Sequence, residues 1–473
     1  MPNTQNIPGD LRAARSASGE LLRIAAPTIV TMMSYPLKQF IDAWMVGLLG
    51  PDYLAAQGNG AVAAFLPISF SFGLFTVVNT WVAQHLGAGH PEKGAAYAWN
   101  ALWMCMIGWV GMLAFAAFVG PLFRMLHHAP LITQLETDYA RILLAGAFFT
   151  MAARAMSHFF YGVHRPVTIM VATIIGNIAN LGLDYTLIFG KFGFPALGIR
   201  GAGIATVIGG VIEFTIPMIV FLGPAFHRAY RTRIHKRISL ERIGEIVRLG
   251  WPGAFQWFNE MVCWSIFMTV FIGSFGAEQN AAGWITLRFM QLSFMPAVGM
   301  SIAVTAVVGR CIGAGDRASA ERRAWIGTGM AMAYMGAFAV LIVIFREAAV
   351  NVFISKRYTP EQAEIVRSVG EKLLILAAMF QVFDAMGIVL LGALRGAGDT
   401  VWPGVASAME AWVFIIGGAW LAMRWLPALE SIGPWISLAA YIILMGVTMA
   451  LRFRFGPWRR ITLLAPEPSR PSW

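Results

Sequence analysis

Long segments without any charged side chain restrict this chain to a membrane. The segment from Leu102 to Leu122 carries no charge, and neither does the segment from Ala324 to Phe345. Each is long enough to cross a bilayer, which requires about 20 apolar residues in a helix. Charged residues make up 12% of the sequence, whereas a soluble domain carries about 25%. We therefore expect an integral membrane protein.

The apolar segments predict an all-α fold with twelve transmembrane helices in two pseudo-symmetric bundles of six. The expected helices are Leu22–Leu48, Gly58–Leu86, Ala95–Phe118, Asp138–Tyr161, Thr168–Phe189, Gly201–Leu222, Ile246–Phe275, Asn280–Val308, Ala324–Phe345, Lys372–Leu394, Trp402–Met423 and Ile432–Leu451.

Positive charge is concentrated in every second loop. With the N-terminus inside the cell, the inside segments hold more than twice as many Lys and Arg residues as the outside loops. The positive-inside rule then places both termini in the cytoplasm, and we expect a multi-pass protein of the cell (inner) membrane. The formal charge of +11 follows from this topology, so we expect no nucleic-acid partner. The polar first 21 residues lack the apolar core of a signal peptide.

A basic linker divides the chain into two halves that resemble each other. We expect a cytoplasmic N-tail (1–21), an N-lobe (22–222), a cytoplasmic linker (223–245), a C-lobe (246–452) and a cytoplasmic C-tail (453–473). Since each half has six helices, an axis along the membrane normal should relate them. The matched landmarks are Arg23-Ile24-Ala25-Ala26-Pro27 with Arg248-Leu249-Gly250-Trp251-Pro252, Leu86-Gly87-Ala88-Gly89-His90 with Ile312-Gly313-Ala314-Gly315-Asp316, and Ala155-Met156 and Gly162 with Ala385-Met386 and Gly392.

Acidic side chains occur inside the predicted helices of both halves. A charge at membrane depth costs several kcal/mol, so it needs a partner, a water-filled cavity or a function. These acids are Asp42, Asp184, Glu213, Glu260, Asp384 and Glu410.

The fifth predicted helix carries a polar stripe. Asn177, Asn180 and Asp184 are spaced i, i+3 and i+7, which places them on one face. Amide and carboxylate oxygens suit a hard cation such as Na⁺, and a buried carboxylate suits a proton. Thr206 on the next helix is a further candidate ligand. Hydrogen bonding between helices is the structural alternative for the asparagines.

The second half places an amide one turn from an acid in two helices. Gln256 precedes Glu260 by four residues, and Gln381 precedes Asp384 by three. The pair Glu260 and Asp384 is therefore a second candidate site for a coupling cation, and packing of a satisfied buried carboxyl is the structural alternative. We expect no other cofactor.

Four motifs give the chain a specific resemblance to a known family. Over about residues 22–452 it resembles the multidrug and toxic compound extrusion (MATE) family, in its prokaryotic NorM- and DinF-like forms. The motifs are Pro27 with Asp42-Ala43-Trp44-Met45-Val46-Gly47-Leu48-Leu49-Gly50, then Asn180-Leu181-Gly182-Leu183-Asp184-Tyr185-Thr186-Leu187-Ile188-Phe189-Gly190, then Gly198-Ile199-Arg200-Gly201-Ala202-Gly203-Ile204-Ala205-Thr206, and Gly392-Ala393-Leu394-Arg395-Gly396-Ala397-Gly398-Asp399-Thr400.

The resemblance implies two lobes that alternate between inward- and outward-facing states. It implies efflux of organic cations, often aromatic drugs, in exchange for Na⁺ or H⁺. Family members use acids at the positions of Asp42 and Asp184, with Asn180, in the N-lobe. The NorM-like branch also uses acids at the positions of Glu260 and Asp384. This chain has both sets, so the lobe that holds the coupling site stays open, as does the choice of ion.

Two cations at membrane depth depart from the family pattern. Lys38 lies one turn before Asp42, so its ammonium can reach the carboxylate and favour its ionised form. Arg154 lies in the fourth predicted helix. The two cations are candidates for binding an acidic or zwitterionic substrate, or for replacing a metal ion. A structural ion pair is the alternative.

The mechanism we expect is competition between the coupling cation and the substrate. Pro27 and Pro36 should bend the first helix, because Pro36 cannot donate to the carbonyl of Met32. We expect a monomer whose partners are a small-molecule substrate and membrane lipids.

Three other classes of protein compete with this interpretation. A flippase of the same superfamily, for lipid-linked or anionic substrates, gains support from Lys38, Arg154 and Arg288. A channel or scaffold leaves the repeat unexplained. An enzyme lacks a nucleophile–base set, since His127 and His128 lie in an outside loop where we expect no partner. We expect the three cysteines to be small buried residues.

Overall fold

Twelve helical spans make up the structure, a computed structural model that describes residues 9–354 and 358–464. No strand occurs within these residues. The spans are α1 (Gly9–Gly47), α2 (Pro51–Leu74) with α3 (Thr76–Gly87), α4 (Pro91–Met125), α5 (Pro130–Ala145) with α6 (Ala147–Gly162), α7 (Pro166–Phe189), α8 (Ile199–Leu222), α10 (Leu240–Ile266), α11 (Ala277–Gly313), α12 (Arg317–Asn351), α13 (Pro360–Ala397), α14 (Val401–Glu410) with α15 (Ala419–Trp425), and α16 (Ile432–Phe455).

Most of these spans can cross a membrane by length and composition alone. Within the described residues, 10 helices pass this test, and α5 and α6, which meet at 47°, together form an eleventh. The helix α1 is the twelfth and, at 39 residues, also the longest. The expected all-α membrane fold with twelve spans is therefore confirmed.

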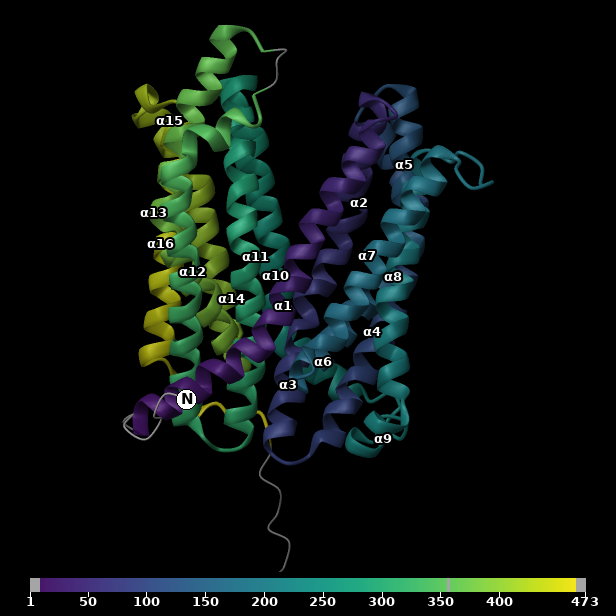
Figure 1. The fold of residues 1–473 in the computed structure, drawn as a ribbon, viewed down its shortest axis with the longest axis vertical. Coiled ribbons are helices and arrows are strands. Elements are labelled where there is room, and N and C mark those ends of the chain that lie inside the picture. The colour runs from purple at the N-terminus through teal and green to yellow at the C-terminus, as the bar shows by residue number, and fades with distance from the viewer. Residues whose placement is uncertain (1–8, 355–357, 465–473) are drawn as a thin grey trace, which may run out of the picture.

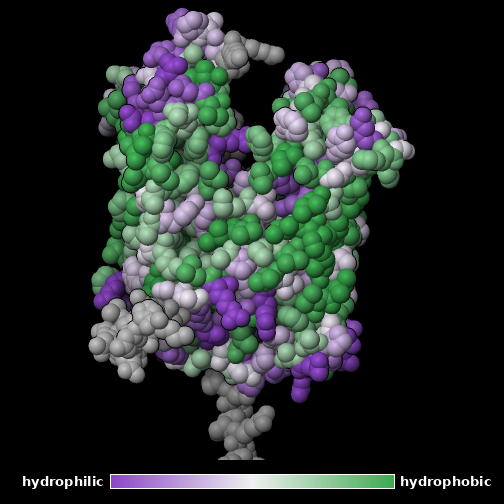
Figure 2. All heavy atoms as spheres, viewed as in Figure 1, coloured by the Kyte–Doolittle hydropathy of each residue, from purple (hydrophilic) through white to green (hydrophobic). Residues whose placement is uncertain are grey.

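The spans form two bundles that splay apart at one end. In Figure 1 the N-lobe, α1 to α8, and the C-lobe, α10 to α16, meet near the end that carries the N-terminus. Figure 2 shows an open cleft between the lobes at the opposite end, with hydrophilic residues inside it and a hydrophobic outer surface. Side chains buried in such a cleft can meet water, whereas the outer surface suits lipid.

Glycines of the repeated motifs let the two lobes cross closely. A Cβ at Gly87 in α3 would collide with the carbonyl of Arg310 in α11, and a Cβ at Gly313 would collide with the carbonyl of Gln84. Gly89 and Gly315 then turn the chain with φ of 81° and 80°, which favours glycine. The matched motifs therefore occupy equivalent places at the interface between the lobes.

Side chains of α3 also hydrogen-bond to the C-lobe backbone. The amide nitrogens of Asn79 and Gln84 donate to the carbonyls of Ile302, at 3.1 Å, and Gly396, at 3.0 Å. The hydroxyl of Thr80 donates to the carbonyl of Arg395 at 2.9 Å. Each bond satisfies a buried polar group that would otherwise destabilise the interface, so the closed end is specifically held together.

The first helix of each half packs on both lobes. Leu21 and Ile24 at the start of α1 lie in the C-lobe core, whereas Met45 near its end packs within the N-lobe. The helix α10 packs in the opposite order. Ile246 near its start lies in the N-lobe core, and Cys263 near its end lies in the C-lobe core. These two helices therefore link the lobes.

Several helix boundaries differ from the sequence prediction, including the start of each half. The helix α1 begins at Gly9 instead of Leu22, since Leu21 is buried against the C-lobe. The expected linker 223–245 contains a short helix, α9 (Pro224–Tyr230), and the first turns of α10. Ser239 caps α10 by accepting a hydrogen bond from the backbone of Arg242 at 3.4 Å, which ends the linker at this point.

Candidate transport site

The polar stripe of the fifth predicted helix lies on α7 with its acid fully buried. Asn180 and Asp184 are both 0% exposed, and Asn177 is half-buried. Neither carboxylate oxygen of Asp184 has a hydrogen-bond partner among the described residues, and the same holds for the side-chain amide of Asn180. Buried polar atoms are almost always paired in folded proteins. The unpaired oxygens of Asp184 and Asn180 are therefore available to bind a cation or a proton.

Packing of α1 on α7 brings a second acid to this stripe. The carboxyl groups of Asp42 and Asp184 lie close enough for their charges to interact. Lys38 lies on the same side of α1, and its Nζ is 4.0 Å from Oδ2 of Asp42. The spacing of Lys38 and Asp42 in the sequence therefore does produce an ion pair, although a loose one.

Neutral oxygen groups surround the two acids. The hydroxyl of Tyr139 on α5 lies near both carboxyl groups and interacts with Gln57 and Thr206. Thr206 thus lies beside the two acids, and Gln57 and Tyr139, which the sequence pattern does not indicate, lie there as well. The predicted second helix leaves out Gln57, which is 7% exposed, because it was expected to begin one residue later, at Gly58. The helix begins at Pro51.

Arg154 lies deeper in the N-lobe, near a further acid. The guanidinium stacks 5.0 Å from the ring centre of Phe72, and its Nε has no hydrogen-bond partner within the described residues. Glu213 on α8 packs against Gly176 of α7 and interacts with the charges of Lys38 and Arg154. One network of charges therefore joins all the unusual residues of this lobe.

The C-lobe holds its own cluster of acids. Nε2 of Gln256 donates to Oε1 of Glu260 at 3.1 Å, as their spacing predicts. Asp384 on α13 is 8% exposed and interacts with the charge of Glu260. Tyr441 on α16, which the sequence analysis missed, lies near these acids and near Glu410. The two candidate sites thus share a design, with two acids from different helices and a nearby tyrosine.

Gln381 does not support Asp384 in the way we expected. Its Oε1 accepts a hydrogen bond from the hydroxyl of Ser293 at 2.8 Å, which joins α13 to α11. The amide oxygen of Gln381 therefore joins α13 to α11. The spacing of three residues between Gln381 and Asp384 did not predict this contact.

Arg395 of the C-lobe lies within electrostatic range of Arg154 in the N-lobe. Arg395 of α13 interacts with the charges of Glu260 in its own lobe and of Arg154 in the other lobe. His158 lies between them on α6, is 1% exposed, and has no hydrogen-bond partner in the described chain. Each lobe therefore contributes a cation to this region in addition to its acids. Arg288, by contrast, is exposed.

Both prolines that should bend the first helix lie inside α1. The hydroxyl of Thr31 donates to the carbonyl of Pro27 at 2.9 Å, and Thr28 donates to Ile24 at 2.8 Å. These hydroxyls bond to carbonyls one turn back, whereas the carbonyls that lose a backbone donor to the two prolines are those of Arg23 and Met32. In Figure 1 this helix changes direction as it passes from the C-lobe to the N-lobe.

Two similar helical lobes, a cleft that opens at one end and buried acids in both lobes define a multi-pass membrane transporter of small molecules. The family model MatE matches residues 27–186 and 256–421. The chain therefore belongs to the MatE family, whose members are transporters and not enzymes.

Curated relatives match nearly the whole chain. The Multidrug resistance protein NorM of Burkholderia vietnamiensis is 29% identical, over 91% of this chain and 92% of that protein. The Probable multidrug resistance protein NorM of Pseudomonas putida is 30% identical, over 94% of this chain and 95% of that protein.

Solved structures share the fold. A MOP superfamily transporter from Pyrococcus furiosus matches with a TM-score of 0.83 and 22% identity, over 94% of this chain and 97% of that chain. The Vibrio cholerae MATE transporter VcmN matches with a TM-score of 0.85 and 17% identity, over 94% and 98% of the two chains.

Proposed function

We propose that the protein is a secondary active multidrug efflux antiporter. It exports organic cations, aromatic ones in particular, in exchange for H⁺ or Na⁺ by alternating access. The observation that carries the proposal is the fully buried carboxyl of Asp184, which lies near Asp42. Its two oxygens have no hydrogen-bond partner in the described part of the chain. The names of the NorM relatives support the substrate class.

Coupling follows from competition for the same negative charge. A proton or Na⁺ at Asp184 and Asn180, or at Glu260 and Asp384, neutralises a carboxylate that would otherwise attract a cationic substrate. Because both ligands favour the same charged group, binding of one weakens binding of the other, and this coupling lets the gradient of the cation drive export of the substrate. The prolines Pro27 and Pro36 give α1 the weak points at which it bends between states.

Transport into everted membrane vesicles tests the proposal. We expect uptake of a fluorescent organic cation when an interior-acid gradient or an interior-Na⁺ gradient is imposed separately, and the productive gradient identifies the ion. Asp184→Asn should abolish uptake, whereas Asp52→Asn, at an exposed acid of the same lobe, should leave it intact. Undiminished uptake in Asp184→Asn would overturn the N-lobe version, and undiminished uptake in Glu260→Gln with Asp384→Asn would overturn the C-lobe version.

The two cations Arg154 and Arg395 favour a second candidate, a flippase for lipid-linked or anionic substrates. Arg154 and Arg395 approach each other across the lobes, and an anionic group would relieve their repulsion. Movement of a fluorescent lipid pyrophosphate across proteoliposomes, with no cation exchange, would establish this function in place of antiport.

The proposal includes the location of the protein in the cell and its oligomeric state. We propose the bacterial inner membrane, with both termini in the cytoplasm, a monomer, and lipids as the other partners. Cysteine accessibility at the N-tail in intact and everted vesicles tests this orientation.

A further inference from the structure

A cavity of about 570 Å³ lies outside the transport site, in the N-lobe between α4 and α5. Figure 1 places this part of α5 at the end of the lobe remote from the N-terminus. The residues that shape the cavity include Gly120, Arg124, His128, Thr133, Thr137 and Arg141. A Cβ at Gly120 would lie 3.3 Å from Nη2 of Arg141, so glycine leaves room for this guanidinium beside α4.

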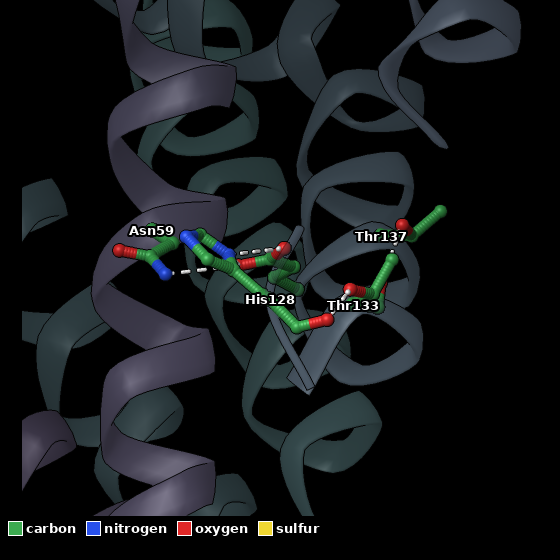
Figure 3. Close-up of polar contacts among 5 residues, drawn as sticks. Asn59, His128, Thr133 and Thr137 are labelled. Carbon is green, nitrogen blue, oxygen red and sulfur yellow. Dashed lines mark hydrogen bonds and ion pairs between the residues drawn. The ribbon is translucent and has the colours of Figure 1, made fainter. Parts of the chain in front are cut away.

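A buried carboxylate fixes one wall of this cavity. Glu136 is 0% exposed and accepts a hydrogen bond from Nδ2 of Asn59 on α2 at 2.9 Å. Nδ1 of His128, in the loop between α4 and α5, lies 3.0 Å from Oε1 of Glu136 (Figure 3). The hydroxyl of Thr133 also bonds to the carbonyl of His128, at 3.4 Å. The loop is therefore held in place, and our expectation that His128 has no partner was wrong.

The charges around the cavity do not balance. Asp138 is already held by Arg200, with Nη2 at 2.7 Å and Nε at 3.0 Å from Oδ2. Arg141 donates from Nε to the backbone carbonyl of Ala116 at 3.2 Å and forms no ion pair within residues 17–354 and 358–464. Arg124 likewise lacks an ion pair within the described part of the chain. Two exposed guanidinium groups thus line the cavity without an ion pair, and the carboxylate that also lines it, Asp138, is held by Arg200.

Large apolar side chains of α4, next to Gly120 and Arg124 in the sequence, are exposed. Phe118 is 67% exposed and Met125 is 73% exposed, and both lie on α4 beside the cavity. In a transmembrane protein such a surface contacts acyl chains, while arginines near a helix end extend toward the headgroups. Guanidinium groups bind phosphate with paired, charge-assisted hydrogen bonds.

We propose that this cavity binds the phosphate of an anionic phospholipid headgroup between Arg124 and Arg141, with the acyl chains along α4. The Glu136 network keeps the cavity open before the lipid arrives. The site is independent of the transport site, because none of its residues touches the acids that we assign to coupling.

Thermal unfolding of the purified full-length protein in detergent tests the proposal. A ligand that binds only the folded state raises the midpoint of unfolding. We expect phosphatidylglycerol to raise the midpoint by several degrees more than phosphatidylcholine. Inorganic phosphate and glycerol phosphate at equal concentration should have little effect, because they lack the chains. An equal shift from either soluble anion, or from phosphatidylcholine, would overturn the lipid assignment.

Variants separate the cavity from the rest of the surface. The double variant Arg124→Gln with Arg141→Gln should remove the extra rise in unfolding midpoint that phosphatidylglycerol gives over phosphatidylcholine. The double variant Arg124→Lys with Arg141→Lys should retain most of this rise. The control Arg424→Gln, at another helix end, should not change it. If the double Gln variant does not fold, Arg124→Gln alone serves, since Arg124 lies in the last turn of α4. A full specific shift in the Gln variants would overturn the proposal.

Discussion

Glu20 of α1 pairs with Arg323 of α12, with Nε of the arginine 3.0 Å from Oε2 of the glutamate. Arg310 of α11 pairs with the other carboxylate oxygen. This cluster attaches the start of α1 to the C-lobe at the closed end of the molecule. It lies beyond the apolar part of α1, so ordinary aqueous titration applies to it.

Glu20→Gln should loosen this attachment in a pH-dependent way. Burial by itself raises the pKa of Glu20, but the hydrogen bond from Arg323 and the charge of Arg310 outweigh burial and hold the pKa below its usual value. The pair therefore stabilises the folded state above the unfolded pKa, and this stabilisation disappears as the pH falls through the folded pKa.

We expect Glu20→Gln to destabilise the protein by about 1 kcal/mol at pH 7, because the group is only partly buried. The difference from wild type should shrink below about pH 4.5, where the unfolded carboxyl becomes protonated. Thermal unfolding at several pH values measures this, with Glu361→Gln at an exposed acid as the control. A pH-independent difference would show that the ion pair is not responsible.

Lys38→Gln should tighten binding of the coupling cation. Removing the ammonium leaves Asp42 and Asp184 with only each other's negative charge, so a bound cation relieves more repulsion than before. The half-saturating concentration of the coupling ion in vesicle uptake should fall several-fold. Lys191→Gln, at an exposed lysine of the same lobe, should leave it unchanged. An unaltered value for Lys38→Gln would mean that the pair is purely structural.

Gly313→Ala should weaken the closed end of the molecule. The new Cβ would collide with the carbonyl of Gln84, which belongs to the backbone of a packed helix and cannot move freely. Overpacking of this kind costs about 1–3 kcal/mol. Gly111→Ala is a matched control because a Cβ at Gly111 meets nothing within 4 Å. Equal unfolding midpoints for the two variants would contradict the close crossing of α3 and α11.

Glu136→Ala should destabilise the open end of the N-lobe. Asn59 and His128 would lose the carboxylate that both contact, and a buried polar group left unpaired costs about 1–3 kcal/mol. Glu136→Gln, which keeps one acceptor oxygen for Asn59, should cost less. Chemical denaturation of the detergent-purified variants measures the order, and a larger loss for the Gln variant would exclude this role.

Short-range spacing in the sequence predicted contacts within single helices well. Gln256 and Glu260 lie one turn apart and are hydrogen-bonded, and Lys38 and Asp42 lie one turn apart and are paired. A helix fixes such distances whatever surrounds it. Gln381 shows the limit, because its amide oxygen accepts from Ser293 of a neighbouring helix, a contact that spacing along one helix cannot predict.

The amino-acid sequence by itself determined that the chain lies in a membrane, that it has twelve spans and that its halves are repeats. The length of each apolar segment and the matched glycine motifs are properties of short stretches of sequence. They do not depend on how the helices pack against one another. Only the tertiary structure decided that Asp42 meets Asp184, that α1 and α10 each reach into the opposite lobe, and that His128 is tied to Glu136. These contacts depend on which helix faces fit together, and that fit arises from side chains far apart in the chain.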